Sequence, residues 1–418
     1  MSTPRTSPAS LSSPAFPWAG LFTLSALIFT SVTSEWLPTG LLPEISAELA
    51  VTESQVGLLI TIFAATVVIS TAPLAALTRN QPRKKLVIIV LLVFVVGNLL
   101  AAAAPNYAVL VIARIIGGLS HGLFWAVVGA YSAHLVPPHQ VGRAVAVTSA
   151  GATAAFVLGV PVGTALGHAL GWRLAFVVIA IIILALTIMV VRILPPVDHQ
   201  QPLATGEISI PLRKDRSVPG VIYVCILVAL VMLGHNLFYT YIVPYLIGPA
   251  GIEGGAVAGV LLIFGAAGAV GLALAGLLVD RFPRSIIPVT VALVAICSAL
   301  LGMFPAEPVI MFIVIAVWGM AFGGVPAMMQ TRLLQLASPR MRDVGSAYLT
   351  TSFNIGIGGG ALLGGILLDQ YGVISLPYVD AGILGVAVVF AIVGGELLRR
   401  RSARVAAVRD QQPTPPAP

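Results

Sequence analysis

The sequence predicts an all-α membrane protein with twelve transmembrane helices, arranged as two parallel six-helix halves. Three observations predict this fold class: the apolar composition, the number of span-length apolar stretches, and a repeat between the two halves of the chain. Of the 418 residues, 58% are hydrophobic and 9% are charged. A soluble domain carries about 25% charged residues, so this composition is typical of a protein embedded in lipid.

The apolar stretches are long enough to cross a bilayer, since about 20 apolar residues span roughly 30 Å of hydrocarbon. They lack the alternating period of a membrane β-barrel strand, and this excludes extended β structure. The twelve predicted spans are Trp18–Leu42, Ser54–Leu77, Leu86–Ala104, Tyr107–Leu135, Ala144–Leu170, Leu174–Leu194, Val221–Ile247, Ala256–Val279, Ile286–Phe304, Val309–Leu336, Gly345–Leu368 and Ile374–Leu397.

The two halves of the chain repeat each other at a constant offset of 201 residues. The offset places Pro43 on Pro244, Phe63 on Phe264, Pro82–Arg83 on Pro283–Arg284, Gly118 on Gly319 and Gly122 on Gly323. Equivalent positions are six spans apart, an even number, so the halves point the same way across the membrane. Parallel repeats of this kind are a transporter architecture that holds its substrate between the halves.

The composition also predicts the boundaries of five segments. We expect 1–16 to be a disordered cytoplasmic tail, 17–194 the first six-helix half, and 195–219 a cytoplasmic linker rich in proline and charge. The second six-helix half follows at 220–398, and 399–418 forms a basic and then proline-rich cytoplasmic tail. Low-complexity polar segments of this kind do not bury enough apolar surface to fold.

The formal net charge of +7 is distributed by topology. All lysines and arginines except Arg114 and Arg173 fall on one side of the predicted spans. The loops of the other side carry acidic residues, namely Glu44, Glu48, Glu53, Glu253, Glu307, Asp369 and Asp380. The positive-inside rule therefore predicts that both termini lie in the cytoplasm. We expect the chain to reside in the inner or plasma membrane of the cell. The basic excess thus indicates no nucleic-acid partner.

Several stretches resemble the major facilitator superfamily over essentially the whole folded chain. "GLLVDRFPRS" after the eighth span is similar to the short basic loop of the family, and "ARIIGGLSHG" is similar to its fourth-span motif. In the first span "TSEWLPTGLLPEI", and in the seventh "GHNLFYTYIVPYL", resemble the sugar-efflux (arabinose-efflux-like) branch of the drug–proton antiporters. The resemblance implies the two-half fold and transport of a small molecule.

The resemblance also implies a conformational clamp on the cytoplasmic side. In the second half it would consist of Asp280, Arg281 and Arg284, with Asp280 facing Arg342. The first-half loop "ALTRNQPRKK" is degenerate: Arg79 stands where the family has aspartate and Pro82 where it has glycine. We therefore expect Arg83 to belong to a weaker clamp.

The fifth span carries "GATAAFVLGVPVGTALG", which is similar to a glycine–proline pattern of antiporters in this superfamily. Gly159, Pro161 and Gly163 match, whereas Val160 stands where the pattern has glycine. Glycines at such spacing permit close helix packing and bending, as rocking halves require.

Glu35 is the only acid expected well inside a span, and Arg114 the only base. A charge at the bilayer centre costs about 2.5–3.5 kcal/mol, so such groups usually face a partner or a cavity. Both lie roughly 10–12 Å from the acidic ends of the first and fourth spans, which are neighbours in the family resembled. We predict that ionised Glu35 pairs with Arg114 and that protonation releases the arginine. The alternative is a permanent ion pair that only orients two helices.

Candidate substrate contacts lie on two spans. Arg114, Gly118, His121 and Trp125 form one stripe of the fourth span, and His121 is also a candidate second proton carrier. The seventh span offers His235, Asn236, Phe238, Tyr239 and Tyr241, which combine aromatic rings with a few polar groups. The alternative is that the aromatics pack between helices and the histidines form local hydrogen bonds.

The leading hypothesis is a secondary active transporter that exports a small organic solute, such as a sugar, nucleoside or drug, in exchange for protons. Such a monomer would need the bilayer and a proton gradient but no cofactor, and the sequence has no metal-ligand spacing and no phosphate loop. The alternatives are a facilitator or a proton-coupled importer of the same fold and, more remotely, a membrane sensor or enzyme. An enzyme would need a catalytic constellation, which the residues do not form.

Overall fold

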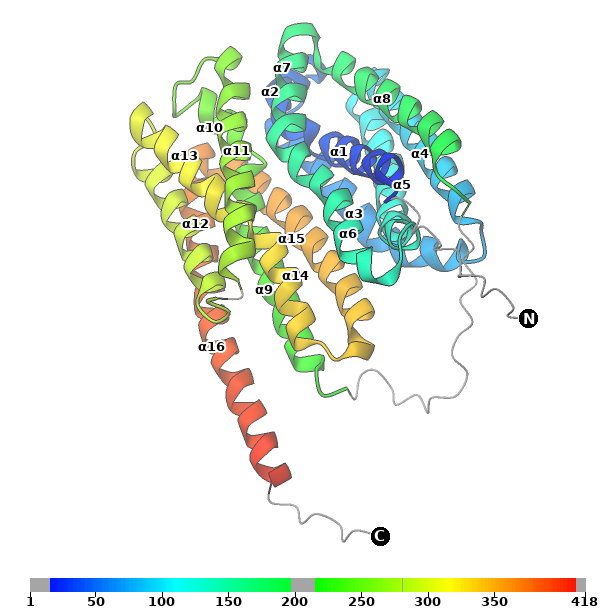
Figure 1. The fold of residues 1–418 in the computed structure, drawn as a ribbon. Helices are drawn as coiled ribbons and strands as arrows, with labels where there is room; N and C mark the ends of the chain where they lie inside the picture. The colour runs from blue at the N-terminus through cyan, green and yellow to red at the C-terminus, as the bar shows by residue number, and fades with distance from the viewer. Residues whose placement is uncertain (1–15, 197–214, 280, 411–418) are drawn as a thin grey trace, which may run out of the picture.

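The computed structural model describes residues 16–196, 215–279 and 281–410 of the chain. All regular elements in this part of the chain are helices (Figure 1). The predicted disordered tails at 1–15 and 411–418, and most of the predicted linker, lie outside the described residues.

The first six spans comprise eight main helices and a π-helical turn. These elements are α1 (Trp18–Gly40), α2 (Leu42–Leu49), α3 (Glu53–Leu77), α4 (Arg83–Ala102), α5 (Tyr107–His134), α6 (Val141–Ala154), the turn η2 (Ala155–Gly159), α7 (Val160–Leu170) and α8 (Trp172–Ile193). The short helix η1 (Pro138–Gln140) precedes α6.

The last six spans follow the linker. Their elements are α9 (Val218–Tyr239), α10 (Ile242–Ile247), α11 (Gly254–Leu278), α12 (Ile286–Met303), α13 (Pro308–Gly323), α14 (Val325–Leu336), η4 (Pro339–Met341), α15 (Arg342–Tyr371), η5 (Val373–Ser375) and α16 (Leu376–Asp410).

Twelve of the described helical segments are long and apolar enough to cross a membrane, which confirms the predicted fold class. The first span breaks at Leu41, and the seventh breaks at Thr240 and Tyr241, so the repeat extends to the position of the break. The tenth span also breaks, at Gly324, where the sequence predicted one continuous helix. The helix of the last span continues beyond its predicted end at Leu397 to Asp410.

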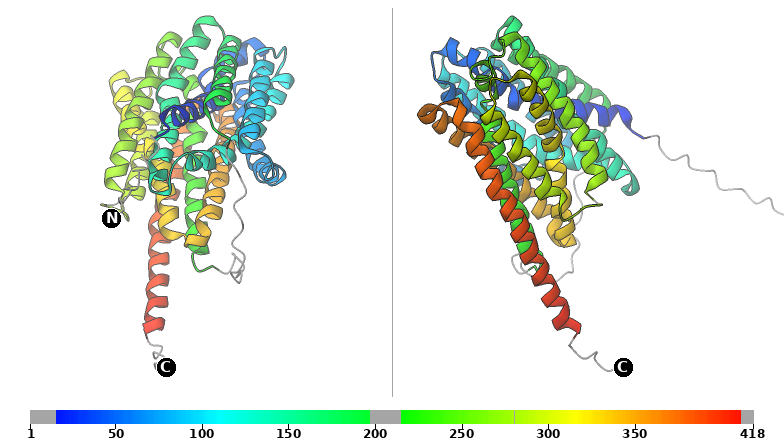
Figure 2. Two further views of the ribbon diagram at one scale, coloured as in Figure 1. Left: turned by 45° about the vertical axis from the view of Figure 1, so that its right-hand side comes forward. Right: turned by 90° about the vertical axis from the view of Figure 1, so that its left-hand side faces the viewer.

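Each half packs around its own set of helices (Figure 2). In the first half α4 lies between α5 and α8, and α1 packs against α6 and α8. In the second half α9 packs against α15 and α16, and α12 lies against α13 and α16. The halves meet where α3 packs against α15 and where α11 packs against η2 and α7. The second and eleventh spans, and the fifth and eighth, therefore form the interface between the halves.

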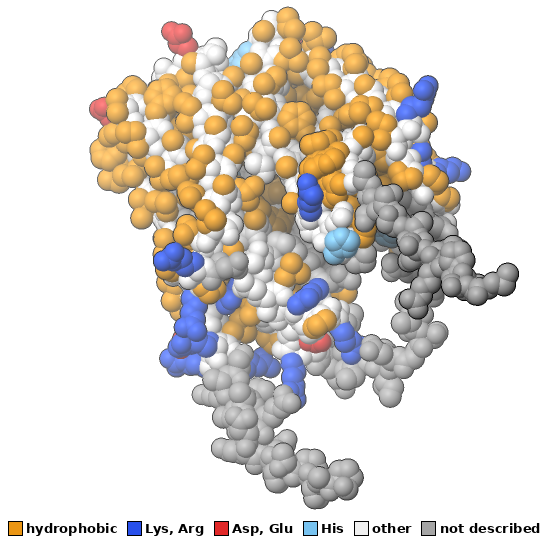
Figure 3. Space-filling model, viewed as in Figure 1, with side chains coloured by type: hydrophobic (Ala, Val, Ile, Leu, Met, Phe, Trp, Pro, Cys, Tyr) orange, Lys and Arg blue, Asp and Glu red, His pale blue; other side chains and the backbone are white. Residues whose placement is uncertain are grey.

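The molecule has two chemically distinct ends, which we name by their charge. The acidic side carries the loops after the odd-numbered spans, and the basic side carries the loops after the even-numbered spans. Lysine and arginine side chains gather mainly below a broad hydrophobic band in Figure 3, and the surface is hollowed between the halves. The hydrophobic band is the surface that contacts lipid.

Hydrogen bonds join the halves toward the acidic side. Ser54 donates through Oγ to Asp369 Oδ2 at 2.7 Å, and Thr61 donates through Oγ1 to the Gly358 carbonyl at 2.9 Å. Toward the basic side, residues of the same two spans are exposed: Leu77 of α3 is 79% exposed and Tyr348 of α15 is 58% exposed. The structure is therefore closed on its acidic side.

Tyr241, at the break of the seventh span, is wedged into this closed end. Its hydroxyl donates to the Ala361 carbonyl at 2.8 Å, and the residue is fully buried. The ring also contacts Gly57 of the other half so closely that a Cβ at Gly57 would lie 2.5 Å from Tyr241 Cζ. Only glycine at position 57 leaves room for this ring.

Candidate functional site

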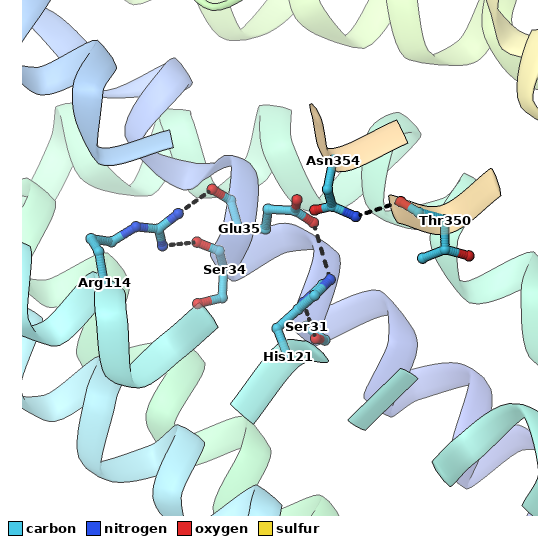
Figure 4. Close-up of polar contacts among 7 residues, drawn as sticks. All are labelled: Ser31, Ser34, Glu35, Arg114, His121, Thr350 and Asn354. Atoms are coloured by element: carbon cyan, nitrogen blue, oxygen red, sulfur yellow. Dashed lines mark hydrogen bonds and ion pairs between the residues drawn. The ribbon is translucent and has the colours of Figure 1, made fainter. Parts of the chain in front are cut away.

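The position of Arg114 is set by a proline in the facing helix. Pro38 lies inside α1 and has no N–H, so the Ser34 carbonyl four residues earlier lacks its helical donor. Arg114 of α5 replaces this donor: Nη1 donates to the Ser34 carbonyl at 3.0 Å, and Nη2 donates to the Glu35 carbonyl at 2.8 Å (Figure 4). The guanidinium also lies over the Phe63 ring, 4.2 Å from its centroid. Arg114 therefore fixes the backbone of the first span.

The carboxylate of Glu35 faces His121 rather than Arg114. Its Oε2 lies 3.5 Å from His121 Nε2, and His121 Nδ1 lies 2.9 Å from Ser31 Oγ. All three side chains are buried. The predicted pairing of the Glu35 carboxylate with Arg114 is therefore wrong for this conformation, because the guanidinium binds the backbone carbonyls of Ser34 and Glu35 instead. Ser31, His121 and Glu35 instead form a polar chain from α1 to α5 and back.

The second half contributes polar groups to the same place. Asn354 of α15 lies beside Glu35 in Figure 4 and points toward the carboxylate, and Thr350 lies on the far side of Asn354. Asn354 Nδ2 donates to the Thr350 carbonyl at 3.0 Å. Neither residue was among the candidates predicted from the sequence. Glu35 thus lies where the two halves meet.

Aromatic side chains from both halves lie near this polar chain. Trp125, half-buried, lies 6.1 Å from His121 between ring centroids. Trp36 of α1 meets Tyr239 of α9 edge to face at 5.8 Å, and contacts Phe156 at 5.7 Å. The Trp36–Tyr239 contact joins the first and seventh spans across the interface between the halves.

The candidate residues of the seventh span are all deeply buried in this conformation. His235 stacks on Phe322 with ring centroids 3.4 Å apart, and Phe238 stacks on Trp318 at 5.2 Å. Asn236 donates to the carbonyl of Met232 on its own helix. His235, Asn236, Phe238, Tyr239 and Tyr241 are each at most 2% exposed. In this state they pack between helices, and among them Tyr239 and Tyr241 also contact the other half.

The glycine–proline pattern packs the fifth span tightly on the first. A Cβ at Gly159 would overlap Thr33, and one at Gly163 would lie 2.8 Å from the Leu37 side chain. Pro161 follows the π-helical turn η2, which also contacts α11 of the second half. The fifth span therefore uses these residues to pack against the first span of its own half, and it also contacts the eighth span of the other half.

The residues of the predicted clamp lie on the basic side. Arg83 begins α4 and Arg342 begins α15, while Arg281 and Arg284 are exposed between α11 and α12. Asp280, the predicted partner of Arg342, lies outside the described residues.

A second carboxyl lies inside a span. Asp380 was expected among the loop acids of the acidic side, although it falls within the predicted span Ile374–Leu397. In the structure it is fully buried in α16 and bonded to Ser298 of α12. The expectation that Glu35 is the only acid well inside a span is therefore wrong, because Asp380 lies four residues inside α16. Among the described residues, no three His, Cys, Asp or Glu side chains lie close enough to hold a metal ion.

Comparison with known proteins identifies the family. The family model described as Major Facilitator Superfamily matches residues 24–342 and 224–418. The chain belongs to the Major Facilitator Superfamily. It is 31% identical over 368 residues to a "Probable sugar efflux transporter" of Mannheimia succiniciproducens, covering 88% of this chain and 91% of that protein. This superfamily member is therefore a multi-pass membrane transporter, and its family and structural neighbours are transporters rather than enzymes.

Solved structures of the superfamily share the fold at low sequence identity. A bacterial homologue of the human lysosomal transporter Spinster, inward-facing and occupied, is 15% identical with a TM-score of 0.73, covering 94% of this chain and 98% of that one. A nucleoside transporter is 13% identical with a TM-score of 0.71, covering 90% and 99%. The human organic anion transporter is 14% identical with a TM-score of 0.67, covering 91% and 100%.

Proposed function

We propose that this transporter exports a small organic solute in exchange for protons, with Glu35 as the proton-carrying group. The observation that carries the proposal is the place of the Glu35 carboxyl: it is buried, it lies at the interface between the halves, and its close partner is His121 rather than a permanent cation. A carboxyl without a fixed counter-ion can exist in both charge states during a transport cycle, and intramembrane carboxyls of this kind mark proton relays.

The polar chain suggests how the charge is handled. With Ser31 donating to His121 Nδ1, the neutral imidazole presents its Nε2–H to ionised Glu35. Protonated Glu35 no longer needs this donor and becomes a donor itself. Substrate hydroxyls would hydrogen-bond the ionised carboxylate, and Asn354 would offer both a donor and an acceptor beside it. Proton and substrate therefore compete for one carboxylate, which is the requirement for exchange.

We further propose that the basic side and both termini face the cytoplasm of the cell membrane, as the positive-inside rule predicts. The present conformation, closed on the acidic side, would then face inward. Residues 17–194 and 220–398 would rock against each other as two halves of a monomer, with the clamp arginines and the Gly159–Gly163 segment at moving contacts. The named sugar efflux relative supports a sugar or a similarly hydroxylated solute as the substrate.

The test is a transport assay in everted vesicles with Glu35→Gln. Substrate added to wild-type vesicles is expected to drive proton movement. Glu35→Gln should abolish proton-driven accumulation while leaving substrate exchange measurable, because glutamine keeps the hydrogen-bonding capacity but cannot ionise. Glu44→Gln is the matched control: this acid lies at the acidic side, bonded to His168 of the same half, and its loss should leave coupling intact.

Three outcomes would decide against the proposal. Transport by wild-type protein without proton movement would identify a facilitator. Proton movement in the same direction as the solute would identify an importer mechanism. Unchanged driven transport by Glu35→Gln would remove Glu35 from the coupling site.

A further inference from the structure

The last span carries a carboxyl group that the coupling mechanism above does not use. Asp380 lies in the second turn of α16 and is 0% exposed. Its Oδ2 lies 2.6 Å from Ser298 Oγ on α12. At about 1.5 Å per residue, both residues lie roughly 6–8 Å from the acidic-side ends of their helices. The group is therefore inside the second half.

No charged side chain balances Asp380. Within the described part of the chain, Asp380 is hydrogen-bonded to Ser298, and its Oδ1 has no hydrogen-bond partner. The elements packed against α16 are α12, α9, α15 and η5. The nearest turns of these elements and of α16 carry the ionisable groups Cys297, His235, Tyr239, Asp369, Tyr371 and Tyr378. Among the described residues, no ion pair or hydrogen bond joins any of these groups to Asp380.

The neighbouring span approaches the unpartnered oxygen closely. A Cβ at Gly234 of α9 would lie 3.0 Å from Asp380 Oδ1 and 3.1 Å from the Leu384 side chain. The oxygen therefore faces the backbone of α9 at a glycine, in apolar surroundings. An ionised carboxylate there would be a buried charge with a single hydroxyl donor, which is costly.

The number of hydrogens available at the Ser298 hydroxyl indicates whether Asp380 is protonated. Its hydroxyl carries one hydrogen but has two oxygens within reach, Asp380 Oδ2 at 2.6 Å and the Val294 carbonyl at 3.2 Å. If Asp380 is protonated, its O–H donates to Ser298 Oγ, and Ser298 donates to Val294. Both contacts are then satisfied, and the remaining Asp380 oxygen is a neutral carbonyl. If Asp380 is ionised, one of the two contacts has no hydrogen.

We propose that Asp380 is a proton-binding site of the second half: it holds a proton in the conformation closed on the acidic side, and the neutral acid ties the twelfth span to the ninth. This site is separate from Glu35, and the proposal does not depend on whether Glu35 couples transport to protons. Its ligand is the proton itself, and its binding residues are Asp380 and Ser298.

The test is infrared spectroscopy of the purified full chain in lipid nanodiscs at neutral pH, in a Glu35→Gln background that removes the other intramembrane carboxyl. The spectrum should contain the C=O absorption of a protonated carboxyl, and Asp380→Asn should abolish it. Glu307→Gln is the matched control, since Glu307 is an exposed acid of the same half. A spectrum that Asp380→Asn leaves unchanged would overturn the proposal.

Two further measurements keep the test decisive if Asp380→Asn folds poorly. Ser298→Ala should shift the frequency of the same absorption, because it removes the acceptor of the carboxyl O–H; no shift would contradict the assignment. Raising the pH should also lower the thermal stability of the wild type more than that of a folded Asp380→Asn variant, because only the wild type can place a charge in this pocket. Parallel losses in the two proteins would count against a bound proton.

Discussion

The contact between Gly57 and Tyr241 allows the equilibrium between the two faces of the transporter to be shifted by one methyl group. The two residues come from different halves, and their contact exists only while the acidic side is closed. Gly57→Ala would place a Cβ 2.5 Å from Tyr241 Cζ and 2.6 Å from Cε1, closer still to the hydroxyl. These atoms cannot coexist at such distances, so the closed end must loosen.

The magnitude follows from the cost of overpacking a well-packed contact, about 1–3 kcal/mol. Because the open conformation separates the two halves, it escapes this cost, and the equilibrium shifts toward it about 5–150-fold. Gly259→Ala is the matched control: it also places alanine in a helix of a span, but its Cβ would meet open space. The gain in helix propensity is the same in both variants and cancels in the comparison.

Labelling of a single cysteine measures the shift. Ser54→Cys is the reporter, because Ser54 is buried at the closed end and becomes accessible when the halves part there. Cys225 and Cys297 are replaced in all proteins compared. Gly57→Ala should label faster with a water-soluble thiol reagent than Gly259→Ala. The double variant Gly57→Ala/Tyr241→Leu should return toward the control rate, since the shorter side chain makes room for the methyl group.

Equal labelling rates in Gly57→Ala and Gly259→Ala would refute the reasoning. Faster labelling that Tyr241→Leu does not reverse would show that the methyl group acts elsewhere in the second span.

Two other contacts give independent predictions. Arg114→Lys should lower the free energy of unfolding by about 1.5–3 kcal/mol, because one ammonium cannot replace a guanidinium that bonds two carbonyls, and at least one charged hydrogen bond is lost. Arg192→Lys is the control: this arginine is exposed on the basic side, and its replacement should change the same unfolding assay little. Asp215, before α9, accepts hydrogen bonds from the Ser217 hydroxyl and backbone N–H and from the Ser338 hydroxyl, which hold the pKa of its carboxyl below the usual value. The ionised Asp215 carboxyl therefore stabilises the fold fully above the usual aspartate pKa, and this stabilisation is lost as the pH falls through the lowered pKa. Thermal unfolding followed down to acidic pH should show a smaller loss of stability in Asp215→Asn than in the wild type.

The sequence predicted the fold because its main determinants are local. Span length follows from the apolar run, and the parallel halves follow from the offset of 201 residues. The breaks were harder to predict, since glycine and proline are tolerated inside many spans. Only at Leu41 and Tyr241 do both halves break at nearly equivalent positions.

The proximity of two candidate residues was predicted from the sequence, but their contacts were not. Glu35 and Arg114 are buried near each other, as their shared depth suggested, yet the arginine binds carbonyls. The signal was present in the sequence: Pro38 stands four residues after Ser34 and therefore frees a carbonyl. The charges of the two side chains favoured an ion pair, but the Ser34 carbonyl, which lacks its helical donor, accepts from the arginine instead.

Asp380 and Asn354 escaped prediction for different reasons. The predicted span Ile374–Leu397 contained Asp380, but the residue lies near the end of that span, where its charge favoured a loop. Its partner Ser298 lies 82 residues away in the chain. Asn354 lies in a glycine-rich run whose evident role is close packing, and only the tertiary structure brings it beside Glu35.

The repeat makes the distribution of acids in the two halves informative. The offset places Glu35 on Asn236, whose side chain donates to the Met232 carbonyl of its own helix. The second half therefore has no ionisable carboxyl at the position that faces the interface, and its buried acid lies instead between the twelfth and ninth spans. A carboxyl at the interface changes its surroundings whenever the halves move, whereas one inside a half changes them only if that half deforms. Under the two proposals made above, Glu35 would exchange its proton in every cycle, whereas Asp380 would keep its proton for as long as the second half moves as a rigid body.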